Sequence, residues 1–418
     1  MKNYIFVIPS ICNIGGAQLY LVNKIHYLRE KGWCVDVIYA RKDKILVKEL
    51  KQFEKNCYPY LNFSTMYYRQ NFVKKKVAQI VQKLKSDTFD YVVVESCTVS
   101  ISTWSELIAQ GLGGKHINFA FEELFEISQS QLKFEYFKHV RHELGGIRPE
   151  SVPLMFKNSK YIIEKPEYYT ACFAFPIANF PDDKTDVLKK YDVVIGSYGR
   201  LNKGFVWDAM KEIFKYMSTH IGKKYALLLI GDTQDVGFKN RIISLFDKVA
   251  DVIITGEIFP TSLNMIKEVD VFVSSAGAAT STAACGIPTI AISPETFLPN
   301  GILNYTTKYN ILSPKPSDKS TSELLEDIID KKFCELHENL GMYDNFFEKR
   351  HTRQWQEFDR QINIAMDNSH PQEYYDVFQI QLEGKRKYAS YFSKVFGYKT
   401  FAKAIALVQR YYGTLIRG

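Results

Sequence analysis

Two cations in a glycine-bounded loop are the first candidates for chemistry. Arg200 and Lys203 lie three residues apart between Gly199 and Gly204, after an expected strand at 192–197. A guanidinium can grip two phosphate oxygens at once, and an ammonium adds a point charge. Such a pair could neutralise the charge that develops on a departing diphosphate. We therefore predict that Arg200 and Lys203 are catalytic and that Gly199 contacts the same ligand. A solvated pair of surface cations is the alternative.

A second candidate is the loop 274–285, which contains only serine, alanine, glycine, threonine and one cysteine. Small side chains let a phosphate or a ribose approach the backbone closely, and hydroxyl groups can donate hydrogen bonds to it. Close packing of a helix on a sheet selects the same small residues. The predicted contacts to a phosphate-bearing donor come from Ser275, Gly277, Ala278, Ala279, Thr280 and Thr282.

A third loop holds two adjacent glycines, Gly15 and Gly16, between an expected strand at 4–9 and an expected helix at 17–31. Glycines allow backbone N–H groups to approach an anion, and the amino end of a helix adds about half a positive charge. We predict that Gly15 and Gly16 assist in binding the donor. A tight strand-to-helix turn without a ligand is the alternative.

Three carboxylates follow expected strands in the first half of the chain. Glu95 ends the apolar run 92–94, and Glu122 and Glu123 follow the run 116–121. The carboxyl ends of parallel strands form the ligand-binding edge of a doubly wound sheet. Carboxylates there could orient the hydroxyls of an acceptor or of a donor, and we predict that Glu122 is catalytic and that Glu95 and Glu123 bind the acceptor. A first-turn helix acid is the alternative for Glu123.

A short basic segment includes His139 and His142, which are three residues apart on an expected helix. That spacing suits a metal, but no separate third ligand is visible in the sequence. We expect no metal site and no cofactor. Arg141 and His142 are instead predicted to contact an acceptor.

The charge of the chain is concentrated at one end. The 418 residues carry a net charge of +8, and from Lys385 onwards there are eight Lys and Arg residues and no acid. The body is therefore neutral. Basic residues mixed with aromatic ones suit the surface of an anionic membrane, which we expect 385–418 to contact. A packed helical appendage or a dimer contact is the alternative. The sequence contains no motif that recognises nucleic acid, so we do not expect nucleic acid as a partner.

Seven scattered cysteines form no CxxC pair, which favours reduced thiols in the cytoplasm and argues against structural zinc.

The apolar run at 4–9 is too short for a signal peptide, so we expect a first strand there. Residues 271–294 carry no charge but include two glycines and two prolines. They predict a buried strand–helix–strand unit, not a membrane span. We expect the protein to be cytoplasmic and to contact the cytoplasmic face of a membrane.

Alternating strand and helix patterns predict two successive α/β halves. The expected strands of the first half are 4–9, 34–40, 91–94 and 116–121, and 161–163 and 171–174 are candidates for its last strands. Those of the second half are 192–197, 226–230, 252–255, 271–273 and 288–292. We expect a first domain over 1–185, a second over 186–345, and helices with the basic aromatic tail over 346–418.

The three loops occur in the order and context of a known family. Further similar segments are Leu229–Asp232, Thr255–Ile258 and Val269–Ser274. Over residues 1–40 and 190–312 the chain resembles the GT-B glycosyltransferases, specifically the retaining glycosyltransferase family 4. The resemblance implies an α/β fold of two Rossmann-like domains facing across a cleft, with C-terminal helices returning to the first domain.

The same resemblance implies a function. The chain would transfer a sugar from a nucleotide-sugar donor to a hydroxyl acceptor with retention of configuration. The first domain would hold a glycan or lipid-linked acceptor, as in surface polysaccharide synthesis, and the second domain would hold the donor. Gly256, Glu257 and Ile258 would border the base of the nucleotide.

The sequence also departs from this family. Members usually carry a Glu-x7-Glu pair where 274–285 has no acid, so Thr280, Ser281 or Thr282 would replace the grip on the ribose. Lys203 lies two residues closer to Arg200 than is typical, and no histidine precedes Glu122. Altered sugar contacts are one consequence and loss of activity is another. The alternative functions are therefore a non-catalytic GT-B scaffold of a glycan assembly complex and, third, an epimerase acting on a nucleotide sugar.

Overall fold

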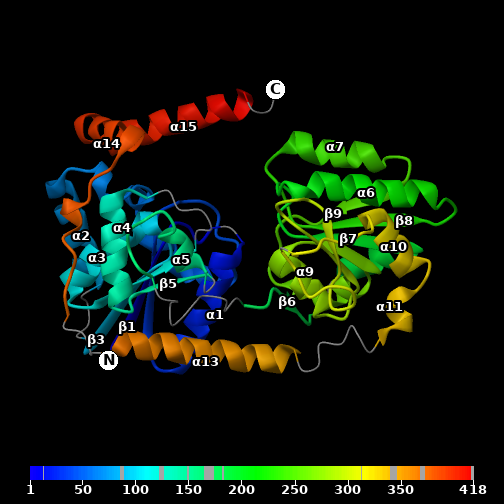
Figure 1. Ribbon diagram of the computed structural model, residues 1–418, viewed down its shortest axis with the longest axis horizontal. Coiled ribbons are helices and arrows are strands. Elements are labelled where there is room, and N and C mark those ends of the chain that lie inside the picture. The colour runs from blue at the N-terminus through cyan, green and yellow to red at the C-terminus, as the bar shows by residue number, and fades with distance from the viewer. Residues whose placement is uncertain are drawn as a thin grey trace. The chain divides into compact units, whose positions relative to one another are not determined.

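The computed structural model describes residues 1–12, 14–84, 89–121, 127–147, 150–163, 174–180, 183–311, 313–338, 346–367 and 372–415. The chain divides into two units, which are coloured by position in the sequence in Figure 1. Unit 1 comprises Met1–Ala174 and Arg350–Gly418, and unit 2 comprises Phe175–Lys349. The C-terminal helices thus belong to the unit formed by the amino-terminal half.

Unit 1 is built on a parallel sheet of five strands. They are β1 (Lys2–Ile8), β2 (Cys34–Tyr39), β3 (Tyr91–Ser96), β4 (Lys115–Ala120) and β5 (Leu144–Gly146). Their order in the sheet is β2-β1-β3-β4-β5. The order reverses between β1 and β3, which is the switch point of a doubly wound sheet. Residues 4–8 of β1 are buried on both faces, which is why the sequence there is a continuous apolar run.

Helices cover both faces of this sheet. They are α1 (Gly16–Glu30), α2 (Gln70–Leu84), α3 (Val99–Leu112), α4 (Gln129–Val140) and α5 (Ser151–Met155), with short 3₁₀ turns η1 (Lys48–Asn56), η2 (Pro59–Asn62) and η3 (Thr65–Tyr67). The core of one face gathers side chains of β1, β3, α2 and α3 around the fully buried indole of Trp104.

The C-terminal elements of unit 1 are α13 (Phe346–Met366), η5 (Val377–Gln379), α14 (Gly384–Phe396) and α15 (Tyr398–Leu415). Helix α13 packs on α1, where the ring of Phe358 lies 5.1 Å from that of Tyr27. The segment between α13 and α14 crosses unit 1 and is held by the Tyr375 N–H, which donates to Glu106 at 2.7 Å. These contacts fix the returning chain to the amino-terminal half.

Unit 2 contains a sheet of six strands. They are β7 (Val193–Tyr198), β8 (Tyr225–Ile230), β9 (Ala250–Ile254), β11 (Val271–Ser274), β12 (Thr289–Ile292) and β13 (Pro299–Ile302). Their order is β13-β12-β11-β7-β8-β9, and only the β12–β13 pair is antiparallel. Counted from β7, this is the 3-2-1-4-5-6 order of a Rossmann fold, with its switch point between β7 and β11.

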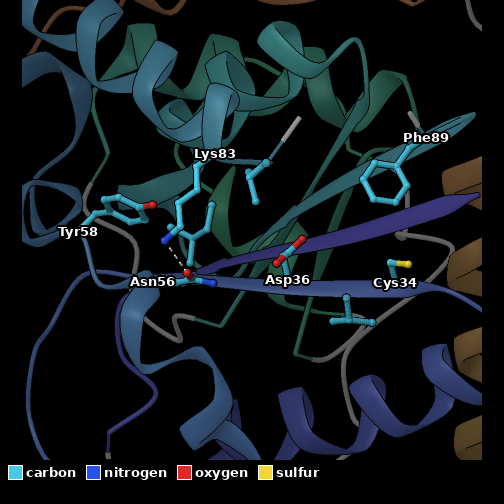
Figure 2. A pocket seen from close by; sticks show the side chains of 9 residues that line it. Cys34, Asp36, Asn56, Tyr58, Lys83 and Phe89 are labelled. Atoms are coloured by element: carbon cyan, nitrogen blue, oxygen red, sulfur yellow. Dashed lines mark hydrogen bonds between the residues drawn. The ribbon is translucent and has the colours of Figure 1, made fainter. Parts of the chain in front are cut away.

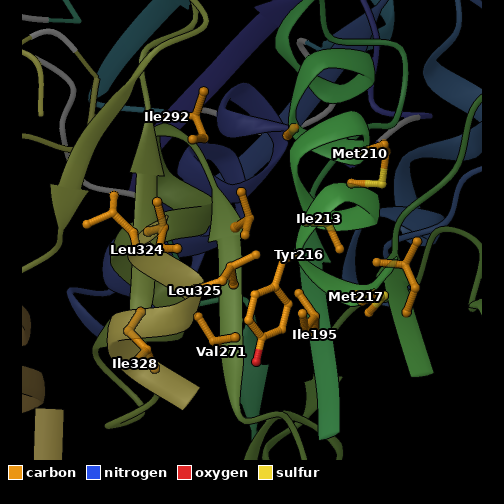
Figure 3. Close-up of a cluster of buried hydrophobic side chains, with 14 of the residues drawn as sticks. Ile195, Met210, Ile213, Tyr216, Met217, Val271, Ile292, Leu324, Leu325 and Ile328 are labelled. Carbon is orange, nitrogen blue, oxygen red and sulfur yellow. The ribbon is translucent and has the colours of Figure 1, made fainter. Parts of the chain in front are cut away.

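The helices of unit 2 are η4 (Asp183–Lys190), α6 (Phe205–Thr219), α7 (Val236–Phe246), α8 (Leu263–Lys267), α9 (Ala276–Ala283), α10 (Thr321–Ile329) and α11 (Phe333–Leu336). Successive residues of β7 point to opposite faces, so Val193 and Ile195 join one core and Val194 the other. Figure 3 shows the first of these cores, in which α6 and α10 pack apolar side chains onto the sheet.

The boundary between the units falls earlier in the chain than the predicted residue 185. The two-residue strand β6 (Ile177–Ala178) pairs with β10 (Thr261–Ser262) and therefore belongs to unit 2. Among the helices in the described part of the chain, none has the length and apolar character needed to cross a bilayer.

Candidate functional site

The switch point of unit 2 lies between two of the predicted loops. β7 leads into Gly199–Gly204, and β11 leads into Ser275 and the first turn of α9. In open α/β sheets, ligands bind outside the carboxyl ends of the strands at the point where the strand order reverses. The fold therefore brings together the cationic loop and the small-residue loop, which are some 70 residues apart in the sequence.

Main-chain hydrogen bonds hold the cationic loop against the loop that follows β8. The Gly199 N–H donates to the Ile230 carbonyl at 2.9 Å, and the Leu201 N–H donates to the Asp232 carbonyl at 3.0 Å. Both Gly199 and Gly231 have positive φ, and a Cβ on Gly231 would lie 1.9 Å from the Gly199 carbonyl oxygen. Only glycine fits Gly231, because the two backbones touch there.

The two cations of this loop have different surroundings. A Cβ on Gly199 would lie 3.9 Å from Lys203 Nζ and 3.8 Å from the Cβ of Ala278, so the ammonium sits beside the start of α9. Arg200 is exposed, and its side chain makes no ion pair or hydrogen bond within the described part of the chain. Its guanidinium is thus available to an anionic ligand.

Asp232, in the loop that follows β8, is an acid at this edge that is already paired. Asp232 accepts from the Lys239 ammonium at 2.5 Å and from the Thr233 N–H at 2.7 Å. Burial alone raises the pKa of Asp232, but these two hydrogen bonds outweigh it and lower the pKa. The carboxylate therefore stays charged and its charge is matched by Lys239, while Arg200 has no ion pair among the described residues.

The amino end of α9 offers unused donors. Ser275 caps the helix with an extended backbone but makes no side-chain capping bond, and its buried Oγ has no hydrogen-bond partner among the described residues. The Ala276 N–H donates to the Asn310 carbonyl at 2.7 Å, whereas the N–H groups of Gly277 and Ala278 have no partner in the same part of the structure. Gly277 is exposed, and a Cβ there would meet open space. An anion could approach these N–H groups directly.

The rest of α9 shows that packing explains part of the small-residue pattern. Ala279 and Thr282 are fully buried, and Thr282 bonds back to the helix carbonyls and to Thr289 Oγ1 at 3.0 Å. The predicted donor contacts of these two residues are therefore corrected, because their side chains face the sheet. Ser281 is buried too and donates to the Gly277 carbonyl at 2.8 Å. Thr280 is half-buried and accepts from the Asn310 amide at 2.8 Å.

The predicted base-binding residues follow β9, the outer strand of the sheet. Gly256 has a φ of +77° and open space around it, and Glu257 is exposed. Ile258 is half-buried against the second core of unit 2. The three residues lie at the same carboxyl edge as Gly199, two strands from β7.

In unit 1, the predicted glycine loop begins α1 at the carboxyl end of β1. Gly15 is the N-cap in an extended conformation, φ −167°, and Gly16 is the first helical residue. The Gln18 amide donates to the Ser10 carbonyl at 2.6 Å and ties the loop to the first turn. The backbone of Gly15 is one that other residues also adopt, so its conformation alone does not require glycine.

Glu95 lies at the end of β3, but the structure corrects its predicted role as an acceptor contact. Its carboxylate is fully buried, 2.6 Å from Lys24 Nζ, and accepts hydrogen bonds from the hydroxyls of Tyr4 and Tyr20. The ion pair with Lys24 and the Tyr4 hydroxyl engage Oε2, and the Tyr20 hydroxyl engages Oε1, so both oxygens have partners inside the core. Glu122 and Glu123, the other predicted acids, lie outside the described residues.

Arg141 and His142 are also placed differently from the prediction. They precede β5 and so lie at the amino edge of the sheet, opposite the carboxyl ends of β1 and β3. Arg141 is buried, with its guanidinium 5.2 Å from the Phe137 ring centre and its Nε 3.4 Å from Glu143. It lines a cavity of about 360 Å³ at that edge. Within the described residues, no group of three His, Cys, Asp or Glu could hold a metal.

Figure 2 shows another cavity, of about 280 Å³, beside the edge strand β2. Lys83 Nζ donates to Asn56 Oδ1 at 2.9 Å and lies 5.6 Å from the ring centre of Tyr58. Cys34 and Phe89 mark the amino ends of β2 and β3 at this cavity. The cavity runs along β2, because Ile38, Asn56 and Tyr58 also line it, and none of the predicted site residues does.

Sequence reasoning missed two residues of the unit 2 site. Gly231 makes the close approach to Gly199, and the strand-then-glycine pattern 226–231 could have indicated it. Asn310 contacts both Ala276 and Thr280 from a loop 30 residues further along the chain. No local pattern around Asn310 signals this contact.

No protein-family model matches the chain, and no curated protein matches it. Among solved structures, a glycosyltransferase from Rickettsia africae is similar, with 15% identity, a TM-score of 0.56, and coverage of 87% of this chain and 96% of that chain. Sucrose-phosphate synthase from Thermosynechococcus elongatus follows, with 15% identity, a TM-score of 0.47, and coverage of 88% and 97%. A UDP-GlcNAc 2-epimerase from Neisseria meningitidis bound to UDP-GlcNAc has 12% identity, a TM-score of 0.45, and coverage of 88% and 100%.

The first of these similarities, together with the two strand orders, establishes the class of fold. The chain has the GT-B fold of two Rossmann-like domains, and the predicted fold class is confirmed. At 15% identity the likeness concerns the fold alone. Membership of glycosyltransferase family 4 stays a prediction.

Proposed function

We propose that the chain is a glycosyltransferase that moves a sugar from a nucleotide-sugar donor to a hydroxyl acceptor. The supporting observation is the arrangement at the switch point of unit 2. The exposed Arg200 and the Lys203 ammonium lie at the same edge as the N–H groups of Gly277 and Ala278. Among the residues that the structure describes, Arg200 has no ion pair and these two N–H groups have no acceptor. Two cations and a helix amino end together suit a diphosphate.

These groups suggest how the leaving group is stabilised. As the bond between the sugar and the diphosphate breaks, negative charge grows on the phosphate oxygens. Arg200 and Lys203 would neutralise that charge, and the fixed N–H groups would need little reorganisation to do the same. Gly256, Glu257 and Ile258 would border the base, and Glu122 keeps its predicted catalytic role. The transfer would retain configuration and need no metal or further cofactor.

The acceptor is proposed to be a growing surface polysaccharide or its lipid-linked precursor. Such acceptors lie at the cytoplasmic face of a membrane, and the basic residues 385–418 would contact that face. The charge of the tail supports this location, because the body of the chain is neutral.

A non-catalytic binding protein with the same fold is the second candidate. The observation that favours it is the lack of any acid in 274–285, where the resembling family carries two. Thr282 and Ser281 are buried, which leaves the half-buried Thr280 as the most accessible of the three proposed substitutes for the ribose grip.

A panel of nucleotides separates the two candidates. Calorimetry of the full chain with UDP, GDP, ADP and CDP should show binding of at least one, and that nucleotide's sugars should then be consumed when a glycan acceptor is added. Binding without turnover over a broad set of donors and acceptors would favour the non-catalytic protein. If no nucleoside diphosphate binds, the proposed donor site is wrong.

A further inference from the structure

Helix α14 presents a continuous apolar stripe to solvent. Five aromatic and aliphatic side chains at spacings of three and four residues are exposed, and they are Tyr388 (78%), Tyr391 (73%), Phe392 (36%), Val395 (47%) and Phe396 (60%). Residues three and four apart lie on one face of a helix. Contiguous exposed apolar side chains of this kind are typical of a site of interaction.

The opposite face of α14 is the one that packs on unit 1. Ser390 and Ser393 are buried, and Ser390 Oγ donates to the Met66 carbonyl at 2.6 Å. Arg69 Nε donates to the Lys394 carbonyl at 2.8 Å. The helix is therefore fixed with its apolar stripe turned away from the core of unit 1.

The start of α15 completes this anchoring. Phe401 is buried, with its ring centre 5.0 Å from that of Phe63 and 5.4 Å from that of Tyr67. The ring of Tyr398 lies 5.8 Å from that of Tyr68. These contacts hold α14 and the start of α15 on unit 1, and both helices are labelled in Figure 1. Within the stripe, the ring of Phe392 lies 6.4 Å from that of Phe401, while Tyr388, Tyr391, Val395 and Phe396 stay exposed.

Cations border the stripe. Lysines without an ion pair in the described part of the chain are exposed along α14 and the start of α15, and they are Lys385, Lys387, Lys394, Lys399 and Lys403. No acidic residue follows Glu383. Long lysine side chains can reach past an apolar face to the headgroups of lipids. An apolar face with cationic flanks is the pattern of a helix that lies in a membrane interface.

We propose that α14 is a fixed interfacial helix that docks unit 1 on an anionic lipid bilayer through Tyr388, Tyr391, Phe392, Val395 and Phe396. The occupant is a bilayer because the stripe is apolar and its flanks carry charge of one sign. If a second copy of the chain bound to the stripe, its lysines would face the lysines of the first copy, and the like charges would repel. This inference sharpens the membrane contact of the proposed function but needs no donor chemistry.

Cosedimentation with vesicles tests the apolar part of the proposal. The full chain should sediment with vesicles of phosphatidylcholine mixed with phosphatidylglycerol and far less with pure phosphatidylcholine. The triple variant Tyr388→Ser, Tyr391→Ser, Phe396→Ser should bind the anionic vesicles more weakly, by roughly tenfold per ring removed. The matched control is Ile221→Ser, Val236→Ser, Leu336→Ser, which removes three exposed apolar side chains from unit 2 and should bind like the wild type.

A second variant tests the charge. Lys387→Gln with Lys394→Gln should weaken binding by roughly fivefold per cation, and added salt should mask the difference. Lys248→Gln with Lys308→Gln, two exposed lysines of unit 2, is its control. Circular dichroism melts of every variant should match the wild type, because all the changed side chains are exposed.

Two outcomes would overturn the proposal. One is vesicle binding that the triple variant leaves unchanged. The other is a dimer in sedimentation velocity that the triple variant dissociates, with no binding to vesicles, because the stripe would then be an interface between copies. All these measurements omit nucleotide, so a failure of the proposed donor site would leave their result intact.

Discussion

Lys24 Nζ lies 2.6 Å from the carboxylate of Glu95, and both side chains are fully buried in unit 1. The ammonium also donates to the Tyr20 hydroxyl at 2.9 Å and to Gln361 Oε1 at 2.8 Å. Gln361 comes from α13, so the pair joins helix α1, strand β3 and the returning C-terminal chain. A buried charge pair of this kind requires that every partner stays in place.

Removal of one partner should therefore be costly. Lys24→Met should lower the free energy of unfolding of unit 1 by about 3–5 kcal/mol, because it leaves the Glu95 carboxylate buried without its counter-charge. Urea unfolding at neutral pH measures the loss. The double variant Lys24→Met, Glu95→Gln should recover part of it. A double variant as unstable as the sum of the single ones would contradict the proposed coupling.

Glu95 also shows what the sequence could and could not predict. Its place at the carboxyl end of a buried strand was predicted from the apolar run 92–94, and β3 is there. The direction in which the Glu95 carboxylate points was not predicted, because its partners are distant in the sequence. Lys24 belongs to the expected helix 17–31, and Gln361 lies 266 positions further along the chain. Nothing in the local pattern distinguishes an acid that faces a ligand from an acid that is paired inside the core.

In unit 2 the sequence predicted more of the candidate site than in unit 1. The strand rhythm predicted the sheet, and the carboxyl-edge rule then predicted which loops meet. Some residues of the small-residue loop face solvent and others pack on the sheet, and the sequence pattern does not show which residues do which. Gly277 remains exposed, while Ala279 packs on the sheet. That division depends on the rotation of α9, which its contacts with the sheet determine.

A second prediction concerns Glu106, whose buried carboxylate lies 2.6 Å from Lys138 Nζ and 2.7 Å from His116 Nδ1. Burial alone raises the pKa of Glu106, but Lys138 and His116 outweigh it and lower the pKa from 4.5 to about 2. Since the folded pKa is the lower one, the stabilisation is present above about pH 4.5 and disappears as the pH falls towards 2.

Glu106→Gln should therefore lower the free energy of unfolding by about 3 kcal/mol at pH 7. The difference from the wild type should shrink as the pH falls below 4.5. Unfolding in urea over a series of pH values measures both effects. Glu30→Gln, an exposed acid of the same unit, is the control and should change little. A difference that does not depend on pH would contradict the charge pairing of Glu106.

A third prediction concerns the contact between Gly231 and Gly199. Gly231→Ala should lower the free energy of unfolding of unit 2 by about 3 kcal/mol or more, because the new Cβ would overlap the Gly199 carbonyl oxygen. Nucleotide binding should be lost with it. Gly222→Ala also sits at positive φ but has open space around it, so it should cost only about 1 kcal/mol. If both substitutions lower the free energy of unfolding equally, the close contact of Gly231 with Gly199 is not the cause of the loss.

A fourth prediction concerns Arg200. Arg200→Ala should lower turnover of the donor by about 10²–10³-fold, because the lost charge acts mainly on the departing diphosphate. Thermal unfolding should be unchanged, since the side chain is exposed and makes no ion pair within the described residues. Lys248→Ala removes an exposed cation that precedes β9, at the other edge of the sheet, and serves as the control. Turnover of Arg200→Ala at the wild-type rate would end the proposed donor role.

The last prediction separates a ligand-binding role of Ser275 from a structural one. Its buried Oγ has no partner in the described part of the chain, so in the absence of ligand Ser275→Ala should leave the free energy of unfolding unchanged or raise it by about 1 kcal/mol. If the hydroxyl serves a phosphate or a ribose, the same substitution should weaken nucleotide binding by about tenfold, which is the value of one hydrogen bond to a charged group. Unfolding without nucleotide and calorimetry with it give the two readouts on one variant. A Ser275→Ala protein that is less stable but binds nucleotide normally would assign the hydroxyl to the fold and not to the donor.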